Sequence, residues 1–221
     1  MVFLNRRWME LKRTILVCIT VFLFFSAGLL FGQDAKPTGE PKVYDAKPTG
    51  APVSEPDLDK SFKKLFPGYD NKPKDDVIYI DDRSLEKKCD YVANKGCRVY
   101  PVKKKGELLG FAIIWQSDGF KGPVKIILGL TQNGEITGLD VLSNNETPQL
   151  GGKIATDQEF QAQFLKRNLA NTRWMLEKDG GDIRAITGAS YSSKAVVSGV
   201  KDTLEFYEKN KENLKKKASG K

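Results

Sequence analysis

The residues best suited to chemistry form the hydroxyl-rich stretch 187–193 (Thr-Gly-Ala-Ser-Tyr-Ser-Ser), directly before a long amphipathic segment. This order predicts that the stretch lies at the start of the last helix. The first turn of a helix has unpaired backbone N–H groups and the positive end of the helix dipole, so it is a natural seat for a phosphate. Gly188 and Ala189 let a bulky ligand approach the backbone. The serines then either hydrogen-bond that ligand or are esterified by it, unless they only cap the helix and face solvent.

The chain contains no histidine and three cysteines. Without histidine, Ser-His-Asp and Cys-His nucleophile chemistry is excluded, and no catalytic residue is predicted. Cys89 and Cys97 lie eight residues apart, in a part of the chain where a disulfide is permitted if that part is exported. Two cysteines without histidine are weak support for a metal site, so none is predicted.

The formal net charge of +8 is concentrated at the two ends of the chain. Residues 1–33 carry four basic residues and one acidic residue, and the tail from Glu208 carries six lysines and two glutamates, which leaves +1 between them. A nearly neutral central domain lacks the electrostatic footprint of a nucleic-acid-binding protein, and no nucleic-acid partner is expected. The Lys-rich tail, 211–221, is interpreted as a solvated, frayed helix end that can also touch anionic lipid headgroups.

Residues 14–32 form an uncharged stretch rich in Leu, Ile, Val and Phe. Its 19 residues are long enough to cross a membrane, at about 1.5 Å of rise per residue. The basic residues precede it, so residues 1–13 are predicted to be cytoplasmic and the rest extracytoplasmic. A signal peptide cleaved near 26–28 is the alternative; an uncleaved single-pass anchor in the cytoplasmic (inner) membrane is favoured, because the stretch exceeds the usual apolar core of a signal peptide.

Residues 33–56 are predicted to be a flexible Pro-rich linker, in which Asp-Ala-Lys-Pro-Thr-Gly occurs twice. The globular domain is expected over 57–210. Alternating apolar residues and turn signals, above all Asn133-Gly134, predict an α+β domain with an antiparallel-rich sheet and packed helices. Strands are expected at 77–80, 96–103, 107–116, 124–130, 135–142, 172–177 and 183–186, and helices at 58–66, after a capping box at 156–159, and from the hydroxyl-rich stretch to about Asn213.

Three aromatic residues in the predicted strands are expected to belong to the core. Phe111 and Trp115 lie on one strand face, and Trp174 lies on another strand. An aromatic side chain at such a position is more often part of the core than a stacking partner for a bound ring.

Two motifs together resemble the FMN-binding domain family. Residues 187–193 resemble its flavinylation motif, and residues 146–151 (Glu-Thr-Pro-Gln-Leu-Gly) resemble its second signature, Glu-Thr-Pro-Gly-Leu-Gly. Both motifs occur in order behind one predicted anchor. The chain is therefore similar to the G subunits of Rnf-type ion-translocating complexes, relatives of the C subunits of sodium-translocating NADH:quinone oxidoreductases. The loop 119–122 also resembles one that lies near the flavin in these proteins.

The resemblance implies FMN bound covalently, with its phosphate esterified to Ser190 by a flavin transferase that uses FAD. It places the loop at 146–151 against the flavin. Thr147 and Leu150 are expected to contact the ring system, with Lys153 near its polar edge. The predicted cofactor-binding residues are Ser190, Thr187, Gly188, Ala189, Tyr191, Ser192, Glu146, Thr147, Leu150, Gly151 and Lys153.

The chain departs from the family pattern at three positions. The flavinylation motif reads Asp-x-x-Ser/Thr-Gly-Ala-Thr, and here Arg184 occupies the aspartate position, with Asp182 two residues earlier. Ser190 replaces the last threonine, and its primary hydroxyl is equally able to accept a flavin phosphate. Gln149 replaces a glycine of the second signature. Arg184 is suited to pair with a phosphate or a carboxylate.

The resemblance implies an electron-transfer subunit of a membrane-bound ion-translocating ferredoxin:NAD oxidoreductase complex. The expected partners are the other membrane and redox subunits, the transferase and the membrane itself. Two other functions are considered: a membrane-tethered assembly or binding module without covalent flavin, and a stand-alone exported flavoprotein reductase.

Overall fold

A computed structural model describes residues 57–220. The predicted cytoplasmic segment 1–13, the predicted anchor 14–32 and the predicted linker 33–56 lie outside the described residues. Among residues 57–220, the helices are all too short or too polar to cross a membrane.

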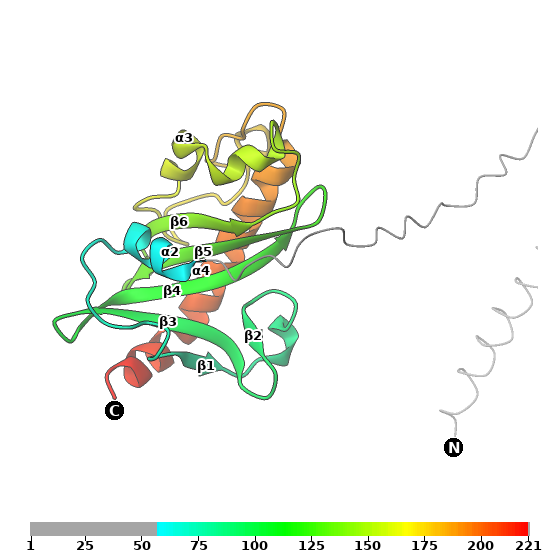
Figure 1. The fold of residues 1–221 in the computed structure, drawn as a ribbon. Helices are drawn as coiled ribbons and strands as arrows, with labels where there is room; N and C mark the ends of the chain where they lie inside the picture. The colour runs from blue at the N-terminus through cyan, green and yellow to red at the C-terminus, as the bar shows by residue number, and fades with distance from the viewer. Residues whose placement is uncertain (1–56, 221) are drawn as a thin grey trace, which may run out of the picture. The chain divides into compact units, whose positions relative to one another are not determined.

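One antiparallel sheet forms the centre of the described chain (Figure 1). Its path runs β1-β3-β4-β5-β6, and the short β2 pairs with β3. The predicted strands up to residue 142 are confirmed, and β2 is an addition. Gly134, in the predicted Asn-Gly turn between β5 and β6, has a φ of 83°, which glycine adopts without strain. The bounds are β1 Ile78–Ile80, β2 Tyr91–Val92, β3 Gly96–Lys104, β4 Glu107–Asp118, β5 Pro123–Thr131 and β6 Ile136–Ser143.

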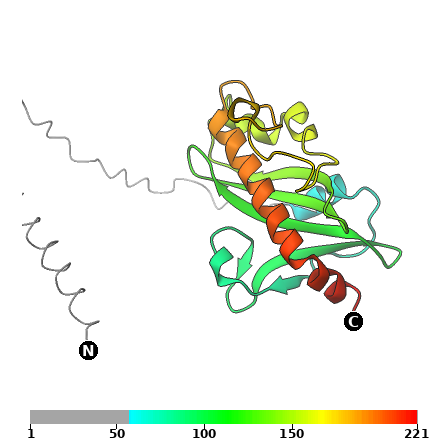
Figure 2. The same ribbon diagram turned by 180° about the vertical axis from the view of Figure 1, so that it is seen from behind.

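Each face of the sheet is covered by a helix. Helix α4 (Ser190–Ala218) crosses one face, as Figure 2 shows, and helix α2 (Leu58–Leu65) packs on the other. On β4, Phe111 and Trp115 point to the α4 side, whereas Ala112 points to the α2 side. This period of two, with both faces buried, explains why β4 and β5 read as nearly continuous apolar runs. The predicted core positions of Phe111 and Trp115 are confirmed, since both are buried.

Helix α2 packs closely against β5 and β6 at Gly129 and Gly138, a contact termed the glycine seat. Its N-cap is Asp57, whose carboxylate accepts hydrogen bonds from the N–H groups of the first turn. A Cβ atom at Gly129 of β5 would lie 3.0 Å from the Leu65 Cβ, and one at Gly138 of β6 would lie 2.9 Å from the Leu65 Cδ2. Larger residues at these positions would therefore hold the helix away from the sheet.

Helix α4 runs farther than the sequence pattern predicts. It continues to Ala218, through much of the Lys-rich tail, instead of ending near Asn213. Leu214 is fully buried in the main core, and the Lys217 ammonium donates to the Tyr79 carbonyl at 3.0 Å. These contacts hold the last turns of the helix against the rest of the domain.

The predicted strands at 172–177 and 183–186 are wrong. This segment forms a closed loop with one isolated parallel bridge between Leu176 and Ile183 and the short helix η3 (Glu177–Asp179). An ion pair between Arg173 and Asp182 closes the loop: the Arg173 Nη2 and Nε both donate to one carboxylate oxygen, Oδ1 of Asp182, at 2.7 and 3.0 Å. The backbone–backbone hydrogen bonds of residues 173–183 join residues of the loop to each other and not to the sheet. Trp174 is nevertheless buried, as predicted.

Between β6 and this loop lie two further short helices, η2 (Gly151–Ala155) and α3 (Gln158–Ala162). The predicted capping box at 156–159 correctly locates the start of a helix, but the residue that caps it differs from the one the box implies. Asp157, not Thr156, is the N-cap of α3, because its carboxylate accepts from the Phe160 N–H at 2.9 Å. A third short helix, η1 (Arg83–Leu85), lies between β1 and β2 in the chain. It precedes Cys89, which is disulfide-bonded to Cys97.

Candidate functional site

The two motifs meet at one cavity of about 200 Å³. Three segments line it: the turn between β4 and β5, the loop between β6 and η2, and the start of α4. The site therefore lies at one end of the sheet, where the N-terminus of α4 reaches these loops. The lining residues are Phe120, Glu146, Thr147, Leu150, Gly151, Gly188, Ala189, Ser190, Tyr191 and Ser192.

The three serines at the start of α4 have different environments. Ser192 is buried and donates to the Glu146 carboxylate at 2.6 Å. Ser193 is buried and accepts from the Ile186 N–H at 3.1 Å. Ser190 is half-buried and lines the cavity, and its hydroxyl makes no hydrogen bond with any residue of the described chain. Ser190 therefore has the hydroxyl available for reaction.

The first turn of α4 has no side-chain cap. The N-cap residue is Ala189, which carries no hydrogen-bonding side chain. Interpreting the serines as a simple helix cap is therefore wrong. The free N–H groups and the helix dipole of this 29-residue helix instead favour an anion next to Ser190.

Glu146 connects the three segments of the site. One carboxylate oxygen accepts from the Lys121 N–H at 2.9 Å, and the other accepts from Ser192. Lys121 lies in the β4–β5 turn, next to Phe120, and Ser192 lies in the first turn of α4, two residues after Ser190. The two hydrogen bonds of this carboxylate therefore fix the turn and the helix start relative to each other.

Two glycines make room for this carboxylate. A Cβ atom at Gly119 would lie 2.6 Å from one Glu146 oxygen, and one at Gly151 would lie 2.6 Å from the other and overlap the Ser192 hydroxyl. A third glycine, Gly188, has a φ of 76° and turns the chain into α4. The small residues of both motifs are thus required by close approach and by backbone conformation.

Three large apolar side chains at this cavity are exposed: Phe120 (67%), Tyr191 (72%) and Leu150 (49%). The ring centroids of Phe120 and Tyr191 are 5.8 Å apart. Exposed aromatic surface beside a small cavity is typical of a ligand site and not of a core. Phe120 is missing from the predicted site residues, although the resemblance of the loop 119–122 pointed to this position.

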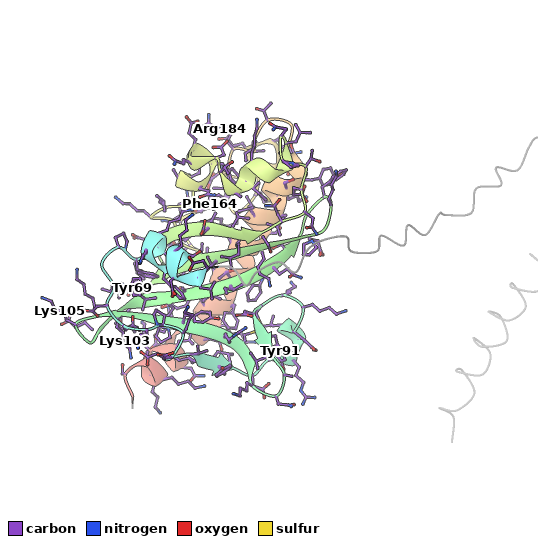
Figure 3. All side chains as sticks on the ribbon, in the orientation of Figure 1. Tyr69, Tyr91, Lys103, Lys105, Phe164 and Arg184 are labelled. Carbon is purple, nitrogen blue, oxygen red and sulfur yellow. A yellow bond between two sulfur atoms is a disulfide. The ribbon has the colours of Figure 1, made fainter. Side chains whose placement is uncertain are left out.

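Thr187 and Lys153 do not line this cavity. They line a neighbouring one of about 320 Å³, together with Arg184. The backbone N–H and carbonyl of Arg184 are both bonded to the Gln163 side chain, at 2.8 and 3.1 Å. Figure 3 shows Arg184 at the end of the molecule formed by α3, away from Lys103 and Lys105 near the β3–β4 turn.

Asp182, the nearest acid to the position where the family has aspartate, is engaged elsewhere. Hydrogen bonds from the Arg173 side chain and backbone lower the pKa of Asp182. This acid therefore belongs to the ion pair that closes the loop 173–182.

A larger cavity of about 850 Å³ is also lined in part by Tyr191. Cys89 and both cationic and anionic side chains contribute to its wall. Tyr191 therefore borders both cavities.

The residues present fit FMN at its phosphate end and beside its ring. A free hydroxyl, an uncapped helix N-terminus and small residues occur together at Ser190, next to exposed aromatic and aliphatic surface. The redox chemistry would come from the flavin, because the cavity presents no histidine or cysteine.

One comparison with known proteins covers the segments that line this cavity. The model of the FMN-binding domain family matches residues 119–205, which include the β4–β5 turn and both motifs. The G subunit of the ion-translocating oxidoreductase complex of Aliivibrio fischeri is 35% identical over 145 residues, covering 60% of this chain and 69% of that protein. The corresponding protein of Stutzerimonas stutzeri is 34% identical over 142 residues, covering 62% of this chain and 58% of that protein.

The G subunit of the Na⁺-translocating ferredoxin:NAD⁺ oxidoreductase complex of Acetobacterium woodii is 33% identical over 113 residues, covering 50% of this chain. The chain thus spans 58% of the Stutzerimonas protein and 55% of the Acetobacterium protein. The crystal structure of Shewanella oneidensis NqrC superposes with a TM-score of 0.46 and 17% identity, over 62% of this chain and 74% of that one. With an FMN-binding domain at 119–205 and these relatives, the chain belongs to the family of G subunits of ion-translocating oxidoreductase complexes.

Proposed function

We propose that this protein is an electron-transfer subunit that carries FMN joined through its phosphate to Ser190. The observation that carries the proposal is the contrast among the serines of the motif. Ser192 and Ser193 use their hydroxyls inside the fold, whereas the Ser190 hydroxyl lines the cavity without a hydrogen-bond partner among the described residues.

Attachment requires a flavin transferase that uses FAD. The bond between Ser190 Oγ and the FMN phosphorus forms, the phosphoanhydride bond of FAD breaks, AMP leaves, and the serine proton is released. The product phosphodiester retains a negative charge beside the N-terminus of α4. The free N–H groups of Ser190 and Tyr191 are positioned to stabilise that charge.

A covalent bond suits a domain outside the cytoplasm, which is where the charge pattern before residue 14 predicts this one to lie. Nanomolar binding, about −12 kcal/mol, still allows slow loss of a cofactor that cannot be replaced from a cytoplasmic pool. In this proposal the residues of the protein hold the cofactor, cover part of its apolar surface and keep its phosphate at the helix start.

The proposed setting is a membrane-bound ion-translocating ferredoxin:NAD oxidoreductase complex. The names of the relatives support it, since they are subunits of ion-translocating complexes and one is part of a Na⁺-translocating ferredoxin:NAD⁺ oxidoreductase. The other membrane and redox subunits would be partners, contacted in part through the predicted anchor at 14–32. In this arrangement the N-terminus is cytoplasmic and the flavin domain is extracytoplasmic.

Intact-mass measurement of the full chain, produced together with a matching transferase, tests the attachment. The expected increment equals FMN minus one water and maps to the peptide that contains Ser190. Ser190→Ala should lose the increment completely, while Ser198→Ala, an exposed serine two turns farther along α4, should keep it. An unmodified wild-type chain, or a modified Ser190→Ala chain, would refute the proposal.

A second experiment separates a complex subunit from a stand-alone reductase. The full chain, extracted in mild detergent from its own membranes, should copurify with hydrophobic integral subunits. Purification of a flavin-loaded chain alone, with full reductase activity toward an external acceptor, would contradict the proposed setting and leave the attachment intact.

A further inference from the structure

Glu146 is the one acidic or basic side chain of residues 57–220 that is buried, at 6% exposure. It also lines the cavity beside Ser190. Charged groups are rarely buried unless a partner of opposite charge compensates them. A buried carboxylate at a ligand site therefore requires an explanation.

Glu146 has no cationic partner among the described residues. None of the ion pairs there includes it, and its two oxygens accept from neutral donors, the Lys121 backbone N–H and the Ser192 hydroxyl. These hydrogen bonds stabilise the carboxylate but do not cancel its charge. Its field therefore extends into the cavity, where the surrounding protein screens it less than water would.

We propose that the buried charge of Glu146 lowers the reduction potential of the flavin held at Ser190. This inference rests on the proposed function. Reduction adds negative charge to the flavin, and a fixed negative charge nearby makes that addition less favourable. Glu146 thus has two effects: its hydrogen bonds position the β4–β5 turn and the helix start, and its charge sets the electron affinity of the cofactor.

Two substitutions separate the charge from the positioning. Glu146→Gln keeps the shape and removes the charge, so the flavin midpoint potential should shift to a more positive value. Ser192→Ala keeps the charge and removes one hydrogen bond that stabilises it, so the potential should shift to a more negative value. A loss of positioning alone would not produce shifts of opposite sign. Glu159→Gln, an exposed acid on α3, serves as the charge-matched control and should not shift the potential.

The measurement is a spectroelectrochemical titration at pH 8 of the full chain with flavin attached, with flavin content determined separately by intact mass. A Glu146→Gln potential that is unchanged or more negative at full flavin content would overturn the inference. If Glu146→Gln does not fold or load flavin, the midpoint potential of Ser192→Ala is the test. A more negative value than that of the wild type supports the inference, and any other result overturns it.

The outcome remains separable from the proposed function. If the wild-type chain carries no covalent flavin, the attachment proposal fails, and free FMN is then titrated in oxidised and reduced form. Glu146→Gln should bind reduced FMN more tightly relative to oxidised FMN than the wild type does. An unchanged ratio of the two Kd values, or no binding of FMN, would overturn the role of Glu146.

Discussion

The two ends of helix α4 differ in how their backbone and side-chain groups are satisfied. At the N-terminal end, Ala189 provides no cap, and Ser190 has a free hydroxyl facing a cavity. At the C-terminal end, the Ser219 N–H and hydroxyl both bond to the Lys215 carbonyl, and Leu214 is buried. The closed end contributes stability, and the open end leaves donors for a ligand.

The two ends of one long helix can thus have different roles, the C-terminal end in stability and the N-terminal end in ligand binding. A change at the closed end should reduce the free energy of unfolding and leave flavin attachment unaffected. A change at the open end should alter the site, with an effect on stability only where a buried hydrogen bond is lost.

The largest effect on stability is expected for Leu214→Ala at the closed end. Removing this fully buried side chain should reduce the free energy of unfolding by about 2–5 kcal/mol, measured by urea denaturation. The exposed neighbour substitution Asn213→Ala should change it by less than about 0.5 kcal/mol. Loss of covalent flavin in folded Leu214→Ala protein would contradict the separation of the two ends.

At the open end, Ser193→Ala should reduce stability by about 1–3 kcal/mol, because it leaves the buried Ile186 N–H without its acceptor. This hydrogen bond fixes the turn that leads to Ser190, so flavin attachment by the transferase should also slow. Ser198→Ala is the matched control on the exposed face of the same helix. If the unfolding free energy of Ser193→Ala equals that of the control, the buried bond has no structural role.

Tyr207 lies in α4 between its two ends, and its ionisation tests the packing of the helix through pH. Burial, followed by the negative charges of Glu208 and Glu212, raises the pKa of Tyr207, whose hydroxyl donates to the Gln132 carbonyl at 2.9 Å. The unfolded chain therefore loses this proton at lower pH than the folded chain. The contribution of this proton to the free energy of unfolding should be constant below about pH 10 and fall above it by up to about 1.4 kcal/mol per pH unit. Urea denaturation at pH 9.5 and 11 measures this loss.

The control for that experiment is Tyr207→Phe, which has no ionisable hydroxyl. Its stability should decline less between the two pH values than that of the wild type. Equal declines would show that other groups cause the loss at high pH.

The smallest effect is expected for Lys217→Ala. Its ammonium donates to the Tyr79 carbonyl, but this hydrogen bond is exposed, so the change in stability should stay within about 0.5 kcal/mol. Lys216→Ala, one residue away and exposed, is the control. A decrease in the free energy of unfolding of more than about 1 kcal/mol is in the range of a buried hydrogen bond. It would show that Lys217, and not Leu214, stabilises the C-terminal end of α4.

Local patterns predicted the central sheet because each strand alternates between two buried faces and ends at a turn residue. The same reasoning failed at 172–186, where apolar residues alternate but the chain closes on itself. The Arg173–Asp182 ion pair joins residues nine apart, and Gly181 packs against the Met175 backbone. Such a loop depends on side-chain contacts that hydrophobic periodicity does not describe.

The site was predictable in part because its residues are short-range motifs. Gly188 and Gly151 stand where backbone conformation or close approach excludes larger residues. The role of Glu146 was not predictable, because it depends on contacts with segments 25 and 46 residues away in sequence. The length of α4 was underestimated because a Lys-rich segment appears solvated until the burial of Leu214 is known.

The glycine seat under α2 determines how closely that helix can approach the sheet. Leu65 lies against the positions of Gly129 in β5 and Gly138 in β6. A larger residue at either glycine would therefore displace α2 from its contact with two neighbouring strands. Because α4 lies on the opposite face of the sheet, such a displacement should open the α2 face and leave the packing of the helix that begins at Ser190 in place.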